Sequence, residues 1–456
     1  MSYSVKKELP VMAGAFDPIV FANMETTYDT VGFFRFRYVY KVSYYSGTGV
    51  VFTDITTIRK YPNNVGTGIV DISRAVQPFI FNVSPTDPNF AGGDEVSELK
   101  TYQWVKLEAG FEYATTATGA VTEYMQTPSV YCLVLNGTFF PATNSLNSQT
   151  VLKQMCLDND PSGITAQLPT AIGTREVSVS ESRLPVRLNQ KGSVGIFNVG
   201  FAEVGFARAA TYVIFRFYEG ATYTEVAETL VNLGVPTPVD EYSDVGSALY
   251  QFFCYPGSLE QSITTALKPT TYPNLTRYEM VFRDASTWTT GDPCSRVYVF
   301  DIEQNTNCQR GMYIRWMNEF GAWDYFFFDG QVQESQTVKR SEYKQVKGNW
   351  FESTGTDFDM LSTARGATSM VTEINDKYLC TTGWITNNQS DMIRSLIRSK
   401  RVEAFWYEAS AEAYTSANYY PVVVMTSQMK YKKNYPDKLF SYQVEFKYAN
   451  SQRPTF

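Results

Sequence analysis

The residues of this chain that could do acid–base or metal chemistry are carboxylates and thiols, because none of its 456 residues is a histidine. A Ser-His-Asp or Cys-His nucleophile therefore cannot form within the chain. Histidine metal ligation and histidine acid–base catalysis are excluded for the same reason. A pair of carboxylates acting on a glycosidic bond is the catalytic arrangement that remains open.

Four carboxylates lie close in sequence to the most aromatic stretch of the chain, and these are Asp301, Glu303, Asp324 and Asp329. Nothing in their spacing pairs two of them across a cleft, and single carboxylates are common on protein surfaces. We therefore expect no catalytic residues and no enzyme activity.

The run Asp158–Gly163 (DNDPSG) begins like a calcium-binding loop. The twelfth position counted from Asp158 is Pro169, where such a loop needs a bidentate glutamate. An Asx-type turn explains this run better than a calcium site does.

Six cysteines are scattered along the chain without Cys-x-x-Cys spacing, at positions Cys132, Cys156, Cys254, Cys294, Cys308 and Cys380. Their largely apolar surroundings predict reduced, buried thiols of a protein that folds in a cytoplasm. Because there is neither a thiolate cluster nor an imidazole, we expect no zinc or other metal site and no cofactor.

The net charge of −7 and the pI of about 5.1 argue against a broad basic surface that binds nucleic acid by sequence. This mild acidity is compatible with a channel through which DNA passes without binding. Four cations cluster near the C-terminal third, at Arg394, Arg398, Lys400 and Arg401. They are expected to complement the C-terminus of a helix, although an acidic neighbour or a phosphate would also suit them.

No membrane partner is expected. The chain has no apolar run near the length of a membrane span. Its start (MSYSVKKELPVMAGAFDP) lacks the apolar region of a signal peptide, so export by the usual route is not expected.

The rest of the chain is organised around Gly311–Asp329 (GMYIRWMNEFGAWDYFFFD). A strand pattern, an Asn-Glu-Phe-Gly interruption and a second aromatic run predict a β-hairpin whose rings are buried. Gly321 can supply the positive φ that such a turn often needs. This hairpin is either a core element or an assembly interface, and its candidate residues are Trp316, Asn318, Gly321, Trp323 and Asp324.

Composition predicts a mainly β, multidomain protein with β-sandwich-like domains and a few short helices. The aromatic content of 15%, led by 32 Tyr and 31 Phe, favours strands. The length suggests two to four domains at about 150 residues each. We expect an N-terminal β domain over residues 1–140, a middle β-rich domain over 141–290, and a C-terminal β domain over 291–456 that holds the aromatic hairpin and one helix.

Individual elements follow from the same patterns. Alternation predicts strong strands over 33–45 and 210–218, and caps predict short helices over 72–79 and 391–398. Residues 333–347 are polar and predict a surface strand or an arm. Long polar connections are expected over 82–98 and 219–246.

Four stretches carry a resemblance to a known family. They are Phe16–Phe21; Lys60–Asn63 with Gly66, Gly68, Asp71, Ile72, Ser73 and Arg74; Trp316–Asp324; and Leu396–Val402 together with Lys438–Ala449. The third (WMNEFGAWD) is the most distinctive. Together they resemble a class of virion structural proteins in tailed phages that infect Bacteroidetes, crAss-like phages included. The chain departs from the family at Ala322, where a second Gly is more usual, and at Ser399-Lys400-Arg401, where a serine and a proline are usual.

The resemblance implies a structural component of a virion that is made in the host cytoplasm. It would assemble with copies of itself and with other tail or neck proteins as an oligomeric ring in the tail, neck or baseplate. The alternatives are a tail-tip carbohydrate- or receptor-binding module and a tail-associated glycosidase. Rings that face a core or a neighbouring subunit would favour the ring protein, whereas an open row of rings in a groove would favour sugar binding.

Overall fold

The structure is a computed structural model of the chain. It describes residues 3–10, 12–26, 33–45, 52–81, 96–98, 102–126, 129–136, 183–187, 192–197, 211–232, 249–256, 275–283, 297–303, 310–318, 321–344, 349–350, 358–359, 366–385, 387–408, 420–426 and 440–449. Within these ranges the protein is mainly β, with several separate sheets and two short helices, α1 (Ser73–Phe81) and α5 (Asn387–Arg398). The fold class predicted from composition is confirmed. Neither described helix is long and apolar enough to cross a membrane.

Two sheets face each other in the N-terminal part. The first has the order β1-β3-β6, formed by Tyr3–Lys7, Val20–Glu25 and Thr67–Asp71. The second has the order β2-β10-β8-β4-β5 with β9 also paired to β8; in chain order its strands are Met12–Gly14, Phe34–Tyr45, Phe52–Lys60, Tyr102–Ala114, Val121–Met125 and Val130–Leu135.

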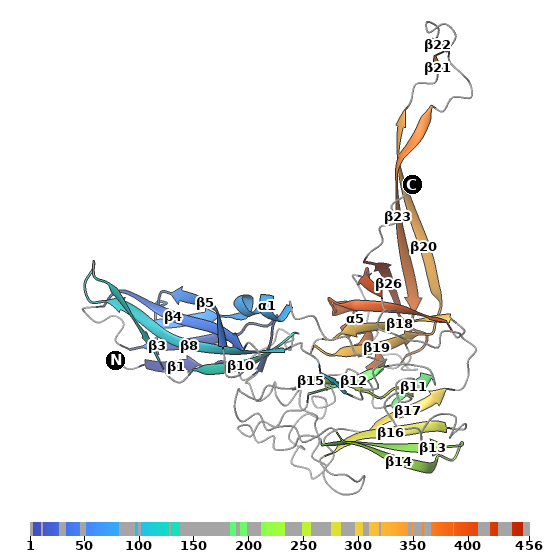
Figure 1. The fold of residues 1–456 in the computed structure, drawn as a ribbon, viewed down its shortest axis with the longest axis horizontal. Helices are drawn as coiled ribbons and strands as arrows, with labels where there is room; N and C mark the ends of the chain where they lie inside the picture. Colours follow the sequence, from blue (N-terminus) through green and yellow to red (C-terminus); the bar gives the residue numbers. More distant parts are fainter. Residues whose placement is uncertain are drawn as a thin grey trace.

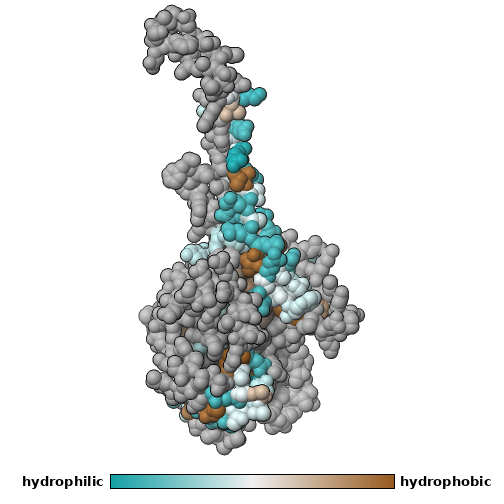
Figure 2. All heavy atoms as spheres, turned by 90° about the vertical axis from the view of Figure 1, so that its right-hand side faces the viewer, coloured by the Kyte–Doolittle hydropathy of each residue, from teal (hydrophilic) through white to brown (hydrophobic). Residues whose placement is uncertain are grey.

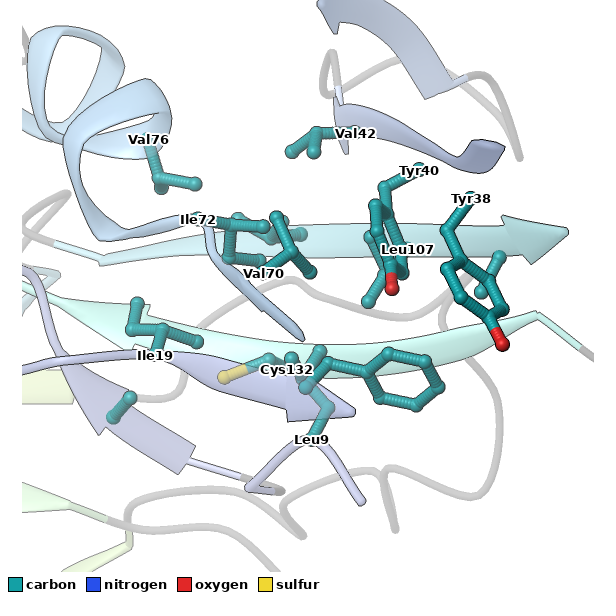
Figure 3. Packing of buried hydrophobic residues seen from close by; sticks show 14 of the residues in the cluster. Leu9, Ile19, Tyr38, Tyr40, Val42, Val70, Ile72, Val76, Leu107 and Cys132 are labelled. Carbon is teal, nitrogen blue, oxygen red and sulfur yellow. The ribbon is translucent and has the colours of Figure 1, made fainter. Parts of the chain in front are cut away.

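The N-terminal core fills the space between these sheets (Figure 3). Tyr38, Tyr40 and Val42 alternate along β4 and point inward, as the period-two pattern predicted. Val70 of β6 and residues of α1 complete the cluster from the other side. Asp71 caps α1, because its Oδ1 accepts hydrogen bonds from the backbone N–H groups of Ser73 (3.0 Å) and Ile19 (3.1 Å).

The middle part also pairs two sheets. A five-stranded sheet has the order β11-β17-β16-β13-β14, and in chain order its strands are Arg183–Arg187, Tyr212–Glu219, Thr224–Asn232, Leu275–Arg283 and Tyr298–Glu303. A three-stranded sheet has the order β12-β15-β7, formed by Ser193–Phe197, Leu249–Phe253 and Val96–Glu98. Phe215, Phe217, Phe252 and Tyr278 are among the rings between them.

These two sheets include strands from outside the range 141–290 that was expected for the middle domain. The five-stranded sheet continues to β17, past residue 290, and β7 from the N-terminal third pairs with β15 of the middle part. The limits at 140 and 290 themselves stay predictions. The connection expected over 219–246 was wrong in part, because β14 occupies Thr224–Asn232.

The C-terminal part is a seven-stranded sheet with the order β19-β18-β24-β25-β26-β23-β20. In chain order its strands are Arg310–Met317, Trp323–Phe328, Val332–Lys344, Ala367–Thr381, Val402–Glu408, Tyr420–Val424 and Gln443–Tyr448. Helix α5 packs on one face through Met392, Ile393 and Leu396. The short strands β21 (Asn349–Trp350) and β22 (Phe358–Asp359) form a separate pair.

The parts are arranged as a stack with two projections (Figure 1). From the bottom of the view upward, the stack consists of the five-stranded sheet, the three-stranded sheet, the β18–β19 hairpin and α5. The N-terminal part lies to one side of this stack, and the β20–β23 hairpin projects away from it. The predicted aromatic hairpin therefore lies inside the stack, with a layer on each side.

Candidate functional site

The turn of the central hairpin is built around Asn318. Strands β18 and β19 pair antiparallel along all six residues of β19. The Asn318 backbone N–H donates to the carbonyl of Ala322 (2.8 Å), and its Oδ1 accepts from the Ala322 N–H (3.1 Å). Its Nδ2 donates to Oδ2 of Asp324 (3.0 Å). Gly321 has a φ of 85°, so the predicted hairpin and the predicted role of this glycine are both confirmed.

The candidate residues Trp316, Asn318, Trp323 and Asp324 are all buried, and Gly321 lies in the same buried turn. Trp316 also fastens the hairpin to α5, because its Nε1 donates to Oγ of Ser395 (3.3 Å). Within one chain these side chains hold the hairpin to the layers around it. Their part in assembly stays a prediction.

A buried ion pair crosses from β18 to β24, and the sequence patterns did not reveal it. Arg315, which is 1% exposed, donates from Nε to Oε2 of Glu403 (2.7 Å). Arg401 donates to the other carboxylate oxygen of Glu403 (3.2 Å). Both guanidinium groups lie over the Trp323 ring, at 4.7 and 5.3 Å from its centroid. The signal that could have found this pair is a single arginine inside an aromatic strand.

The second face of the hairpin is buried against the three-stranded sheet. Strand β19 packs on β12, and Tyr325 of β19 is buried there. Burial raises the pKa of Tyr325 to about 12, and the neighbouring Arg315 offsets part of that rise. The hairpin thus has an apolar face toward α5 and a polar, fully packed face toward the middle part.

The N-terminal part also reaches this hairpin. Nδ2 of Asn136 lies 3.5 Å from Sδ of Met317, at the end of β18. The Lys400 ammonium group lies 3.4 Å from the centroid of the Phe16 ring. The hairpin and the segment after α5 are therefore the place where all three parts of the chain meet.

The predicted polar arm is the β20–β23 hairpin. The two strands pair from Val332 with Cys380 at the base to Lys344 with Ala367. Every residue of β20 after Val332 is exposed, and no strand pairs with the outer edge of β20 in the described part of the chain. Figure 2 shows mainly hydrophilic residues along its coloured length, with isolated hydrophobic ones.

An exposed tryptophan stands beside the base of this arm. Trp384 is 75% exposed, whereas Thr382 and Ile385 on either side are buried. Ile385 and Phe440 exchange two backbone hydrogen bonds of 2.7 Å, and the Thr382 N–H donates to the carbonyl of Tyr442 (2.9 Å). A large apolar ring is thus presented to solvent on a fixed stretch of backbone.

The other candidate groups are dispersed. Asp301 pairs with Arg277 in the middle part (2.8 Å), whereas Asp324 accepts a hydrogen bond from Asn318 in the central hairpin. Among the described residues, no three His, Cys, Asp or Glu side chains come together as a metal site. Asp158–Gly163 lies outside the described residues. Of the basic cluster, Arg401 and Lys400 are engaged within the chain by the contacts given above.

Comparison of the chain with protein-family models and with curated proteins finds no match.

Proposed function

We propose that this chain is a structural protein of a tailed-phage virion that assembles with copies of itself into a ring in the tail, neck or baseplate. The observation that carries the proposal is the projecting β20–β23 arm, whose outer strand is exposed along 12 of its 13 residues. At about 3.3 Å per residue, this strand is about 43 Å long.

Such an arm has little to stabilise it within one chain. An isolated two-stranded ribbon is marginally stable in water, and exposed strand edges invite pairing with another chain. A neighbouring copy that covers the arm would supply the missing contacts. Trp384 at the base fits the same function, because tryptophan often carries much of the binding energy of an interface.

The positions of the four stretches that resemble virion proteins support the assignment of the chain to a virion. These stretches are distant in sequence and touch one another in space. Three contacts join them: Ile19 N–H to Asp71, Lys400 to the Phe16 ring, and Met317 N–H to the carbonyl of Arg401. The resemblance therefore follows one connected region around the central hairpin.

The arrangement of the rings favours this function over sugar binding. The rings of the central hairpin are mostly buried, including Trp316, Trp323 and Phe328. The exposed rings of the described residues lie on separate elements, and they are Phe34, Tyr61, Tyr124, Tyr223, Tyr343, Trp384 and Tyr420. A binding module that stacks sugars would instead align several rings along one groove.

The test is the mass of the full-length protein in solution as its concentration rises, compared with a variant whose arm is shortened. Residues 336–376 are replaced by Asn-Gly, because Ser335 and Lys377 are paired and a two-residue turn fits between them. The wild type is expected to form a defined oligomer and the shortened variant to remain monomeric.

The matched control shortens a different exposed hairpin. Residues 115–120 are replaced by Asn-Gly between Ala114 and Val121, which are also paired. This control is expected to assemble like the wild type. A wild type that stays monomeric at every concentration, or a shortened arm that leaves the oligomer intact, would contradict the proposal.

A further inference from the structure

One face of the five-stranded sheet carries charges that alternate from strand to strand. The face belongs to Arg216 and Tyr218 of β13, because Phe215 and Phe217 point the other way into the core. In the first row, Arg216 lies between Glu279 of β16 and Glu228 of β14 in the strand register. Its Nε donates to Oε2 of Glu228 at 2.9 Å.

A second row runs parallel to the first. Asp301 of β17 pairs with Arg277 of β16 at 2.8 Å, and the Arg277 guanidinium lies 3.7 Å from the centroid of the Tyr223 ring. On the next strand, β13, Tyr218 lies opposite Arg277, and on β14 Glu225 lies opposite Tyr218. Tyr218 donates its hydroxyl hydrogen to Glu279 (3.1 Å), which links the two rows.

Both rows end in a glutamate on β14, the outermost strand of this sheet among the described residues. A bulge between Phe217 and Tyr218 shifts the register there, so Glu225 and Glu228 lie on the same face although three positions separate them. Both glutamates are exposed. The sheet therefore presents an acidic strand at an open edge.

Cross-strand pairs of opposite charge stabilise a sheet, and like charges directly opposite each other destabilise it. A strand that continued these rows beyond β14 would therefore be basic and polar. Strand addition of this kind uses backbone hydrogen bonds for affinity and side-chain complementarity for selectivity.

Two exposed edge strands with this chemistry are β1, which ends in Lys6 and Lys7, and β20. We take β20, because it projects from the stack (Figure 1) and is exposed along 12 of its 13 residues. Its outer half, residues 338–344 (VKRSEYK), holds Lys339, Arg340 and Lys344 and a single carboxylate, Glu342. Strand β14 (TEVAETLVN) holds two carboxylates and no cation. In the strand register Arg340 lies opposite Thr372 of β23 and Lys344 lies opposite Ala367, so neither of these two cations has a carboxylate opposite it on β23.

One copy cannot make this contact with itself. Figure 1 shows the arm at the top of the stack and β14 at its bottom. A pairing of β20 with β14 must therefore join two copies through different surfaces. Such head-to-tail contacts close into rings when the rotation between copies allows.

We infer that β20 of one copy adds to the open edge of β14 on the next copy, with Arg340 and Lys344, which share one face of β20, on the side of Glu225 and Glu228. This inference rests on the proposed function, and it names the two surfaces that the ring contact would use. The contact is polar and exposed at its rim, so charge contributes both selectivity and rate of association.

The experiment is a charge exchange in the full-length chain, read as the concentration at which half of the protein is assembled. Arg340→Glu with Lys344→Glu is expected to raise this concentration at least about tenfold, and Glu225→Lys with Glu228→Lys to do the same. All four substitutions together are expected to bring it back to within about threefold of the wild type, because the pairing is then complementary again with reversed signs.

Two controls make the result specific. Lys6→Glu with Lys7→Glu alters the exposed strand β1 by the same charge as the arm variant, and it is expected to leave assembly unchanged. Glu225→Gln with Glu228→Gln removes the acidic charge without placing a cation beside Arg216. This variant is expected to weaken assembly in the same direction even if the lysine variant folds poorly.

A thiol cross-link tests the contact directly. Ser341→Cys in β20 and Thr229→Cys in β14 are combined in one chain, and a short bis-maleimide is expected to give covalent oligomers. Each single substitution is the control for the native thiols. An oligomeric wild type that gives no such cross-link and is unaffected by charge reversal would overturn this inference alone. A wild type that stays monomeric would overturn both this inference and the proposed function.

Discussion

Arg315 is a charged side chain held in the most aromatic part of the protein. Its partner, Glu403, is 88 positions away in sequence, so no local pattern could have predicted the pair. Removing one member of a buried pair leaves the other charge in a poorly solvated place, which costs more than the pair itself contributes.

We expect Arg315→Met to lower the free energy of unfolding by about 3 kcal/mol, near the lower end for breaking a buried pair because Arg401 still contacts Glu403. Urea unfolding followed by tryptophan fluorescence measures this change. The double variant Arg315→Met with Glu403→Leu is expected to recover most of the loss. A single variant as stable as the wild type would show that the pair is not buried in solution.

The raised pKa of Tyr325 predicts a loss of stability in alkali. Below pH 10 the phenol is protonated in the folded and the unfolded chain alike, so its contribution is constant. Between pH 10 and about 12 the unfolded chain releases this proton while the folded protein keeps it. The free energy of unfolding therefore falls in this range, by up to about 1.4 kcal/mol per pH unit for one proton.

Tyr325→Phe removes this titrating proton, so the free energy of unfolding is expected to fall less steeply with pH, by the contribution of one proton. The urea midpoint across the same pH range measures the slope. Tyr61→Phe, on an exposed loop, is the control and is expected to keep the wild-type slope. Equal slopes for all three proteins would place the Tyr325 phenol in contact with water.

At the scale of elements, sequence patterns predicted the strands that bury one face along a regular alternation. Strand β4 and the β18–β19 hairpin are of this kind, and so is α1 with its Asp71 cap. The start predicted for the second helix at residue 391 was wrong, because α5 begins at Asn387 and the expected cap residues lie inside it. Strand β14 escaped prediction because its bulge breaks the alternation: Val226 and Ala227 are adjacent and both pack against the core. A search for alternating apolar and polar residues does not detect a strand in which a bulge interrupts that alternation.

The base of the arm carries a prediction at this scale. Trp384→Ala is expected to leave the thermal midpoint of the monomer unchanged, because the ring is exposed and touches little. It is expected to raise the concentration for half-assembly at least about tenfold, as interface tryptophans commonly do. Sedimentation over a range of concentrations measures this change.

Tyr61→Ala is the matched control, since Tyr61 is a similarly exposed ring on the N-terminal part. An equal effect of the two substitutions on assembly would mean that Trp384 has no special part in the contact.

For the whole molecule, the order in which the sheets stack could not be predicted from the sequence. The stack depends on contacts such as that of β12 with β19, which join strands that no loop length or periodicity relates. The sequence identified the hairpin at the centre and its buried rings. It did not reveal that the three parts of the chain meet there, because that follows from packing rather than from pattern.

The charges of the two proposed contact strands give a prediction for the whole assembly. Raising the salt concentration from about 0.1 to about 1 M shortens the Debye length from about 10 to about 3 Å. Assembly of the wild type is therefore expected to weaken with salt, measured as a rising concentration for half-assembly. The Gln variant of Glu225 and Glu228 is expected to respond less steeply, and an identical salt response in both proteins would argue against a charged contact.

Strand β23 gives the arm a mechanical property. It spans 15 residues, with a bulge in its pairing to β20 between Ser369 and Val371, and leads from the buried Cys380 beside β26 out to Ala367 on the arm. A pull on the arm along this strand is carried directly into the sheet, where the ladder to β26 lies across the direction of force and its hydrogen bonds share the load. A sideways push would instead bend a two-stranded ribbon, because among the described residues no third strand pairs with β20, and β23 pairs with β26 only over Tyr378–Thr381. The arm thus resists stretching along its length but bends under a sideways force. It can therefore hold a neighbouring copy at a fixed distance while the angle between the two copies changes.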